Sequence, residues 1–184
     1  MTTIRLFLVS LLAILLAACT SIKVDMPRGT SKGYSSARLV KRAPGSSITD
    51  STERQVHGMI QGAIKKQFQA KGLGYGQSGA DLVVAYMVLY QEPGMTAQYD
   101  DYFGYGRDAN HITDRAHQVG TVDGKRPDYF ERAGIVIDVI DAKTNKLVYR
   151  NYAAEDVVRG ASSATRSARI NAAVAQTLSG FFAG

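Results

Sequence analysis

The sequence predicts an α+β domain in which a small, largely antiparallel sheet of three to five strands carries two helices packed on one face. Two segments, 50–72 and 162–182, place apolar residues at the spacing of a helix with one apolar side. Between them, 82–90 and 129–157 contain apolar runs of strand length, the second divided by a turn. A content of 45% hydrophobic and 21% charged residues is that of an ordinary globular domain.

The first helix is expected to begin at Asp50 or Ser51, because either side chain can accept a hydrogen bond from an N–H of the first turn, and to end at Gly72. Its apolar face follows i, i+3, i+4 and i+7 spacing and consists of Val56, Met59, Ile60, Ala63, Ile64 and Phe68. Gly58 and Gly62 lower the helix propensity. The stability of this helix should therefore come from packing.

The second helix, 162–182, has the same amphipathic pattern. We expect it to keep Arg166 and Arg169 outside and to bury a stripe made of Ile170, Val174, Leu178 and Phe181. On the first helix, His57 lies beside the apolar stripe, so it should be a partly buried or surface histidine rather than a ligand.

Residues 82–90 predict a strand inside the sheet, since both alternating sets of side chains are apolar. The stretch 129–157 predicts a hairpin whose turn, "DAKTNK", offers Asn145 for a left-handed position. One face of this hairpin should carry Ile135, Ile137, Val139, Leu147 and Tyr149. A weaker strand pattern lies around 37–40.

The first 18 residues are typical of a signal peptide, with Arg5 as the one charge before Cys19 and an apolar run, Leu6–Ala18, shorter than the roughly 20 residues of a membrane span. Leu16-Ala17-Ala18-Cys19 places small residues directly before the one cysteine of the chain. This motif resembles the lipobox of bacterial lipoproteins, in which the thiol is linked to a diacylglycerol and the cysteine becomes the acylated N-terminus. An ordinary secretory signal with an incidental cysteine is the alternative.

The mature chain is therefore expected to be held at a membrane by acyl chains such as palmitate on Cys19, without spanning it. In Gram-negative lipoproteins an Asp after the cysteine commonly signals retention in the inner membrane, so Thr20 implies the outer membrane and the periplasm. Residues 19–49 should form a tether with possible N-terminal strands, and 50–184 the α+β domain. Export argues against nucleic acid as a partner despite a net charge of +6.

Residues 91–128 predict a long, polar loop rich in Gly and Asp. Aromatic and acidic residues alternate within it: Tyr99, Asp100, Asp101, Tyr102, Phe103 and Tyr105. Such a pattern suits contact with an envelope protein, peptidoglycan or lipid, and a merely variable surface loop is the alternative. Adjacent carboxylates such as Asp100 and Asp101 point in different directions, which does not suit a facing acid/base pair.

Four potential metal ligands follow in steps of three: Asp108, His111, Asp114 and His117. On a loop they could converge on a divalent ion, and a metal-binding protein or metal-assisted hydrolase is the alternative function. On a straight helix, steps of three spread the side chains around the axis, and a solvated polar segment is then expected.

Other catalytic signals are weak. Gly74, Gly76 and Gly79 match G-x-G-x-x-G, but this motif must follow a strand and open a helix, and here it follows a helix and precedes a strand. The one cysteine is expected to be acylated, and no serine has a His and acid partner by motif. We therefore expect a protein that is not an enzyme and needs no cofactor.

Four phrases, "TERQVHGMIQGAIKKQFQAKGL", "ADLVVAYMV", "AGIVIDVIDAKTNKLVYRNYA" and "RINAAVAQTL", together resemble the bacterial lipoproteins built on domain of unknown function 4136. The resemblance covers about residues 50–182. Asn145 stands where that family usually has Gly, and Tyr149 where Trp is frequent. The family has no established activity, so the resemblance implies the fold and no catalytic residues.

Overall fold

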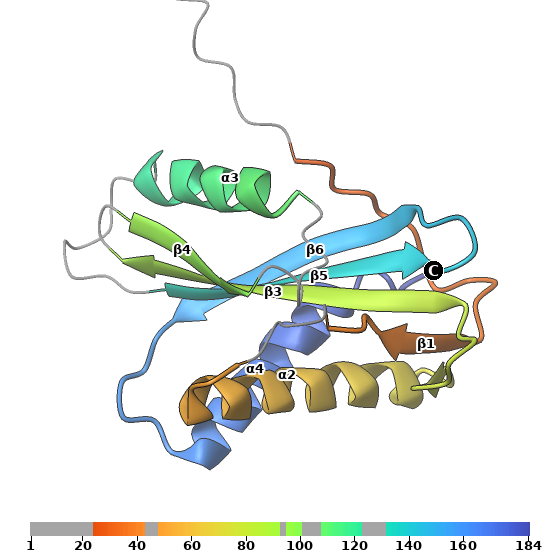
Figure 1. Ribbon diagram of the computed structural model, residues 1–184, viewed down its shortest axis with the longest axis horizontal. Helices are drawn as coiled ribbons and strands as arrows, with labels where there is room; N and C mark the ends of the chain where they lie inside the picture. Colours follow the sequence, from red (N-terminus) through yellow and green to blue (C-terminus); the bar gives the residue numbers. More distant parts are fainter. Residues whose placement is uncertain (1–23, 43–47, 93–94, 101–107, 123–131) are drawn as a thin grey trace, which may run out of the picture.

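The computed structural model describes residues 24–42, 48–92, 95–100, 108–122 and 132–184 (Figure 1), without the side chains of 92–100 and 116–122. Within these residues a sheet of six strands carries helices on both faces. The predicted α+β class with a mostly antiparallel sheet is confirmed. Among the described helices, none is long and apolar enough to cross a membrane.

The sheet has the strand order β2-β1-β3-β5-β6, with β4 pairing to β3 beside this path. The short β1 is parallel to β2 and β3, whereas the pairs β3–β4, β3–β5 and β5–β6 are antiparallel. The bounds are β1 Ser36–Leu39, β2 Gly74–Tyr75, β3 Leu82–Glu92, β4 Met95–Asp100, β5 Arg132–Asp141 and β6 Leu147–Asp156. The interior position predicted for 82–90 is confirmed, because β3 lies between β1 and β5.

One face of the sheet is covered by α2 (Ser51–Ala70) and α4 (Ser163–Leu178). Each begins at a side chain that accepts a backbone hydrogen bond: Asp50 from the N–H of Glu53 at 2.7 Å, and Ser162 from that of Thr165 at 3.1 Å. The core under these helices contains Ile60, Ile64, Phe68, Leu82, Val84, Tyr86, Ile137, Val139, Tyr149, Val174, Leu178 and Phe181. The predicted pair of helices on one face is confirmed.

The opposite face carries α3, Ala109–Val122, which lies against β4 and β3. Its Ala109 and Ile112 belong to a buried apolar cluster with Val83, Met87 and other residues of β3 and β5. The prediction of one long loop over 91–128 is wrong, since β3 extends to Glu92 and is followed by β4 and α3. Ala109, Ile112, Ala116 and Val119 do follow helical spacing, but the Gly and Asp content of the segment favoured a loop and concealed both elements.

The hairpin prediction is confirmed. In the β5–β6 ladder Ile137 stands opposite Asn151 and Val139 opposite Tyr149. Asn145 has φ 54°, the left-handed conformation that an Asn in a turn tolerates. The Asp141 carboxylate accepts hydrogen bonds from the N–H groups of Lys143 and Thr144, which fixes the turn.

Part of the predicted tether, 19–49, belongs to the sheet. The strand pattern around 37–40 corresponds to β1. Upstream of β1, Arg28 forms an antiparallel bridge with Tyr149, the N–H of Gly29 donates to Val148 O at 2.8 Å, and the N–H of Arg150 donates to Pro27 O at 3.1 Å. The residues from 27 to 29 therefore lie along the start of β6.

Candidate functional site

The residues predicted to form a contact surface lie at the edge of what the structure describes. Tyr99 and Asp100 are on β4, where only the backbone is described. The other four, Asp101, Tyr102, Phe103 and Tyr105, and the predicted acylation site Cys19, lie outside the described residues. Their roles remain predictions from the sequence.

The potential metal ligands are on α3 or next to it. His111 and Asp114 are exposed, and the side chain of His117 lies outside the described part. Asp108, at φ 57°, points to the sheet and forms an ion pair with Arg150. Within the described residues, no group of three or more His, Cys, Asp or Glu side chains could hold a metal ion. The structure thus brings Asp108 to an arginine.

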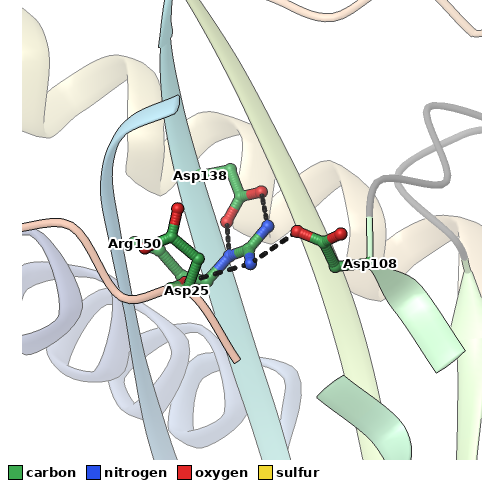
Figure 2. A network of polar contacts seen from close by, with 4 residues as sticks. All are labelled: Asp25, Asp108, Asp138 and Arg150. Carbon is green, nitrogen blue, oxygen red and sulfur yellow. Dashed lines mark hydrogen bonds and ion pairs between the residues drawn. The ribbon is translucent and has the colours of Figure 1, made fainter. Parts of the chain in front are cut away.

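The ion pair partner of Asp108 is the centre of a buried polar network (Figure 2). Arg150 on β6 and Asp138 on β5 are directly opposite in the ladder, and both are fully buried. The guanidinium binds the carboxylate with two bonds, Nε to Oδ1 at 2.7 Å and Nη2 to Oδ2 at 2.6 Å. Its Nη1 reaches the Asp108 carboxylate and the carbonyl oxygen of Asp25, both at 3.1 Å.

This network joins four segments: β5, β6, the start of α3 and the N-terminal segment at Asp25. A buried guanidinium that donates to carboxylates and a carbonyl is in a strong, fixed arrangement. Its role is therefore to hold chain segments together on the α3 face of the sheet. The sequence carries a signal for this network: Asp138 interrupts an apolar strand, and the hairpin register places Arg150 opposite.

A pocket of about 400 Å³ lies on the other face, between the N-terminal halves of α2 and α4 and the adjoining ends of β3, β5 and β6. Its walls are mainly apolar and include Val56, Ile60, Val88, Ala133, Ile135, Ala153, Ala161, Ile170 and Ala173. Charged residues also line it: Asp50, Glu53, Glu155, Asp156, Arg166 and Arg169. A concave, apolar pocket with a few polar groups is the usual form of a small-molecule site.

His57 lines this pocket and is almost fully buried, with 2% of its surface exposed. Its Nδ1 lies 2.7 Å from the hydroxyl oxygen of Tyr86, which also accepts a hydrogen bond from Gln61 at 3.1 Å. The other ring nitrogen is 3.8 Å from the Glu53 carboxylate. The helix register thus places His57 deeper than its position beside the apolar stripe implied.

The three glycines of the G-x-G-x-x-G match connect α2 to β3, with Gly74 in β2 and Gly76 at φ 96°. Their N–H groups at Gly74 and Gly76 donate to carbonyls of Ser35 and Ala37, which holds β2 beside β1. These groups therefore form sheet and turn structure.

The fold is an α+β domain with a mixed but mostly antiparallel sheet, α2 and α4 on one face and α3 on the other. The family model described as "Domain of unknown function (DUF4136)" matches residues 32–181. The chain belongs to this family, as the sequence phrases predicted.

The solved structures that match this chain are remote in sequence. Two PelC dodecamers from Paraburkholderia phytofirmans are 12% and 11% identical, with TM-scores of 0.44 and 0.43; the matches cover 88% and 87% of this chain and 96% of each PelC chain. A PDZ domain protein from Parabacteroides distasonis is 11% identical with a TM-score of 0.44, over 78% of this chain and 31% of that one. No curated protein matches the sequence.

Proposed function

We propose that the mature chain is a non-enzymatic, periplasm-facing lipoprotein of the outer membrane that acts as a binding or structural accessory of the cell envelope. The observation that carries this proposal is the motif Leu16-Ala17-Ala18-Cys19, in which small residues precede the one cysteine of the chain. Thr20 in place of Asp supports the outer membrane as the destination.

The path of the N-terminal segment suits a domain that lies close to a membrane. The described chain begins at Val24, and the residues from 27 to 29 are already bound along β6. Four residues separate Cys19 from Val24, and the five Cα–Cα steps between them span at most about 17 Å, at about 3.5 Å per residue of an extended chain. An acyl anchor on Cys19 would therefore hold the domain near the lipid headgroups.

We assign partner contact to the region 91–128. Its described part comprises the end of β3, the strand β4 and the helix α3, which displays exposed His111, Asp114 and Arg115. The aromatic and acidic residues at 99–105 belong to the same region. The partner is an envelope protein, peptidoglycan or lipid.

The anchor is tested by feeding cells a labelled fatty acid. The wild-type chain should take up the label, and Cys19→Ser should not. Thr20→Asp should keep the label and move the protein to the inner-membrane fraction, whereas Thr20→Ser is the matched control and should stay in the outer membrane. A wild-type chain without label, or a labelled Cys19→Ser chain, contradicts the proposal.

Contact through 91–128 is tested by in-cell photo-cross-linking from Tyr102 or Tyr105. We expect one defined adduct from these positions and none from Lys65, which is exposed on α2 on the other side of the sheet. The same adduct from Lys65, or none from either tyrosine, argues against this contact surface.

A further inference from the structure

The pocket between α2, α4 and the sheet exists because small side chains stand where larger ones would fill the core. Four alanines line it, Ala133, Ala153, Ala161 and Ala173, from β5, β6, the segment before α4, and α4. Protein interiors are packed about as densely as organic crystals, and voids larger than a water molecule are few. The mainly apolar hollow of about 400 Å³ therefore results from the alanines at this junction, and it suits an apolar ligand.

The acidic residues that line the pocket have partners. Glu155 pairs with Arg169 at 2.8 Å, and Asp156 lies 3.5 Å from Arg132. The side chain of Asp50 accepts from the N–H of Glu53.

Glu53 in turn lies 3.8 Å from a ring nitrogen of His57. Asp50, Glu155 and Asp156 are therefore already close to an arginine or an N–H donor, and Glu53 lies beside the His57 ring.

Arg166 differs from these groups. It is partly buried on the first turn of α4 and lines the pocket, one turn before Arg169. Within the described part of the chain its side chain makes no hydrogen bond and no ion pair. A guanidinium always carries its charge and binds carboxylates with two parallel bonds, so the complementary group is an anion at the end of an apolar ligand.

We propose that this pocket binds a single-chain anionic amphiphile, a long-chain fatty acid, with its hydrocarbon chain between α2, α4 and the sheet and its carboxylate at Arg166. The volume lies near the lower end of the range for small-molecule sites, about 300–1,000 Å³, which fits one chain better than a two-chain lipid. The inference goes beyond the proposed anchor, because it concerns reversible binding inside the folded domain and does not require acylation of Cys19.

The test uses the full-length chain in phosphatidylcholine liposomes and a palmitate that carries a photoreactive diazirine on its chain. After illumination and digestion, we expect saturable cross-links in the peptides that contain Val56, Ile60 or Ile170, and competition by unlabelled palmitate. Ala173→Phe and Ala133→Phe fill the pocket from two different elements, and at least one of them, verified as folded by circular dichroism, should abolish these cross-links.

The carboxylate is tested by comparing palmitate with hexadecanol as competitors. In the wild-type chain palmitate should compete about tenfold better than hexadecanol. Arg166→Ala should remove this preference and leave competition by hexadecanol unchanged. The matched control Lys65→Ala, on the exposed side of α2, should retain it.

Three results would overturn the inference: no cross-link to the pocket, equal cross-linking in both folded pocket-filling variants, or an unchanged preference in Arg166→Ala. A pocket filled by another segment of the chain itself would give the first result. The anchor is judged separately, because label on Cys19 falls in a different peptide.

Discussion

Both faces of the sheet bury apolar side chains, and among the described residues the α3 face adds a fully buried ion pair of Arg150 and Asp138. On the α2/α4 face, Tyr149 and Phe68 pack around Phe181, with ring centroids 5.5 and 6.0 Å from it. On the α3 face, the same hairpin places the buried pair Arg150 and Asp138 among apolar residues. Side chains alternate along a strand, so neighbouring positions of β6 serve both faces.

This difference separates two tasks, the stability of the fold and the positioning of chain segments. Apolar burial is non-directional and accounts for stability, and it suits the face that carries two long helices. Charge-assisted hydrogen bonds are directional, and Arg150 uses them to fix the positions of the N-terminal segment and of the residue before α3. The α3 face is therefore arranged to hold particular segments in place.

The largest loss of stability on the α3 face is expected from Arg150→Met. Removal of the guanidinium takes two charge-assisted hydrogen bonds from the buried Asp138 carboxylate, and such losses cost about 3–5 kcal/mol of unfolding free energy. Urea unfolding of the variant measures this cost.

The double variant Arg150→Met with Asp138→Leu should recover most of the lost stability, because an apolar pair of similar volume can replace a buried ion pair. Even so, it should leave the N-terminal segment more open to proteolysis than in wild type. A double variant as unstable as Arg150→Met would show that the network contributes stability beyond segment positioning.

The corresponding test on the α2/α4 face is Phe68→Ala. Phe68 is fully buried and its ring contacts Tyr75, Phe181 and Phe182. Loss of the ring should cost about 3–5 kcal/mol in the same urea measurement, with no change in protease sensitivity around residues 24–29. A cost below about 1 kcal/mol, or release of the N-terminal segment, would contradict the separation of tasks.

The N-terminal segment is tested directly by Gly29→Ala. A Cβ atom at Gly29 would collide with the carbonyl oxygen of Val148, so the segment must move away from β6. We expect faster tryptic cleavage after Arg28 than in the wild-type chain, with a smaller effect on unfolding than Arg150→Met. Equal cleavage rates would show that the segment does not depend on this close approach.

Gly62→Ala is the matched glycine substitution on the other face. Gly62 is exposed within α2, and nothing lies within 4 Å of an added Cβ. Because alanine has the higher helix propensity, the variant should be more stable by about 0.5–1 kcal/mol in thermal or urea unfolding. Destabilisation would mean that α2 depends on this glycine for packing.

The smallest effect is expected at an exposed carboxylate, Asp81. Its pKa is lowered, chiefly by hydrogen bonds from the hydroxyl and the N–H of Ser35, with Ser36 adding to them. A group whose pKa is lower when folded stabilises the protein above the unfolded pKa of about 3.9, and this contribution disappears as the pH falls through the folded value. Asp81→Asn should therefore lower the melting temperature at neutral pH, and the difference from wild type should vanish in acid.

The sequence predicted the elements whose signal is local. The periodic apolar residues of α2 and α4, the doubly apolar β3 and the hairpin turn at Asn145 are all where the pattern indicated. The family phrases gave the same arrangement. Each of these rests on neighbours a few residues apart, which a single sequence displays directly.

The parts that the sequence did not predict depend on partners distant in the chain. α3 carries apolar residues at helical spacing, but the Gly- and Asp-rich sequence around it indicates a loop, and the residues that Ala109 and Ile112 pack against lie elsewhere in the chain. The pocket results from alanines on separate elements, and no local motif marks their convergence. The contact between Asp108 and Arg150 spans 42 residues, so no local spacing indicates it.

The attachment of the residues from 27 to 29 along β6 also has a mechanical consequence. A pull on the chain at Val24 is taken first by the backbone bonds of Pro27 and Gly29 to β6 and by the guanidinium that holds Asp25. These contacts would rupture before load reaches the long ladders of β3, β5 and β6. The attachment can therefore break under tension while the rest of the domain stays folded.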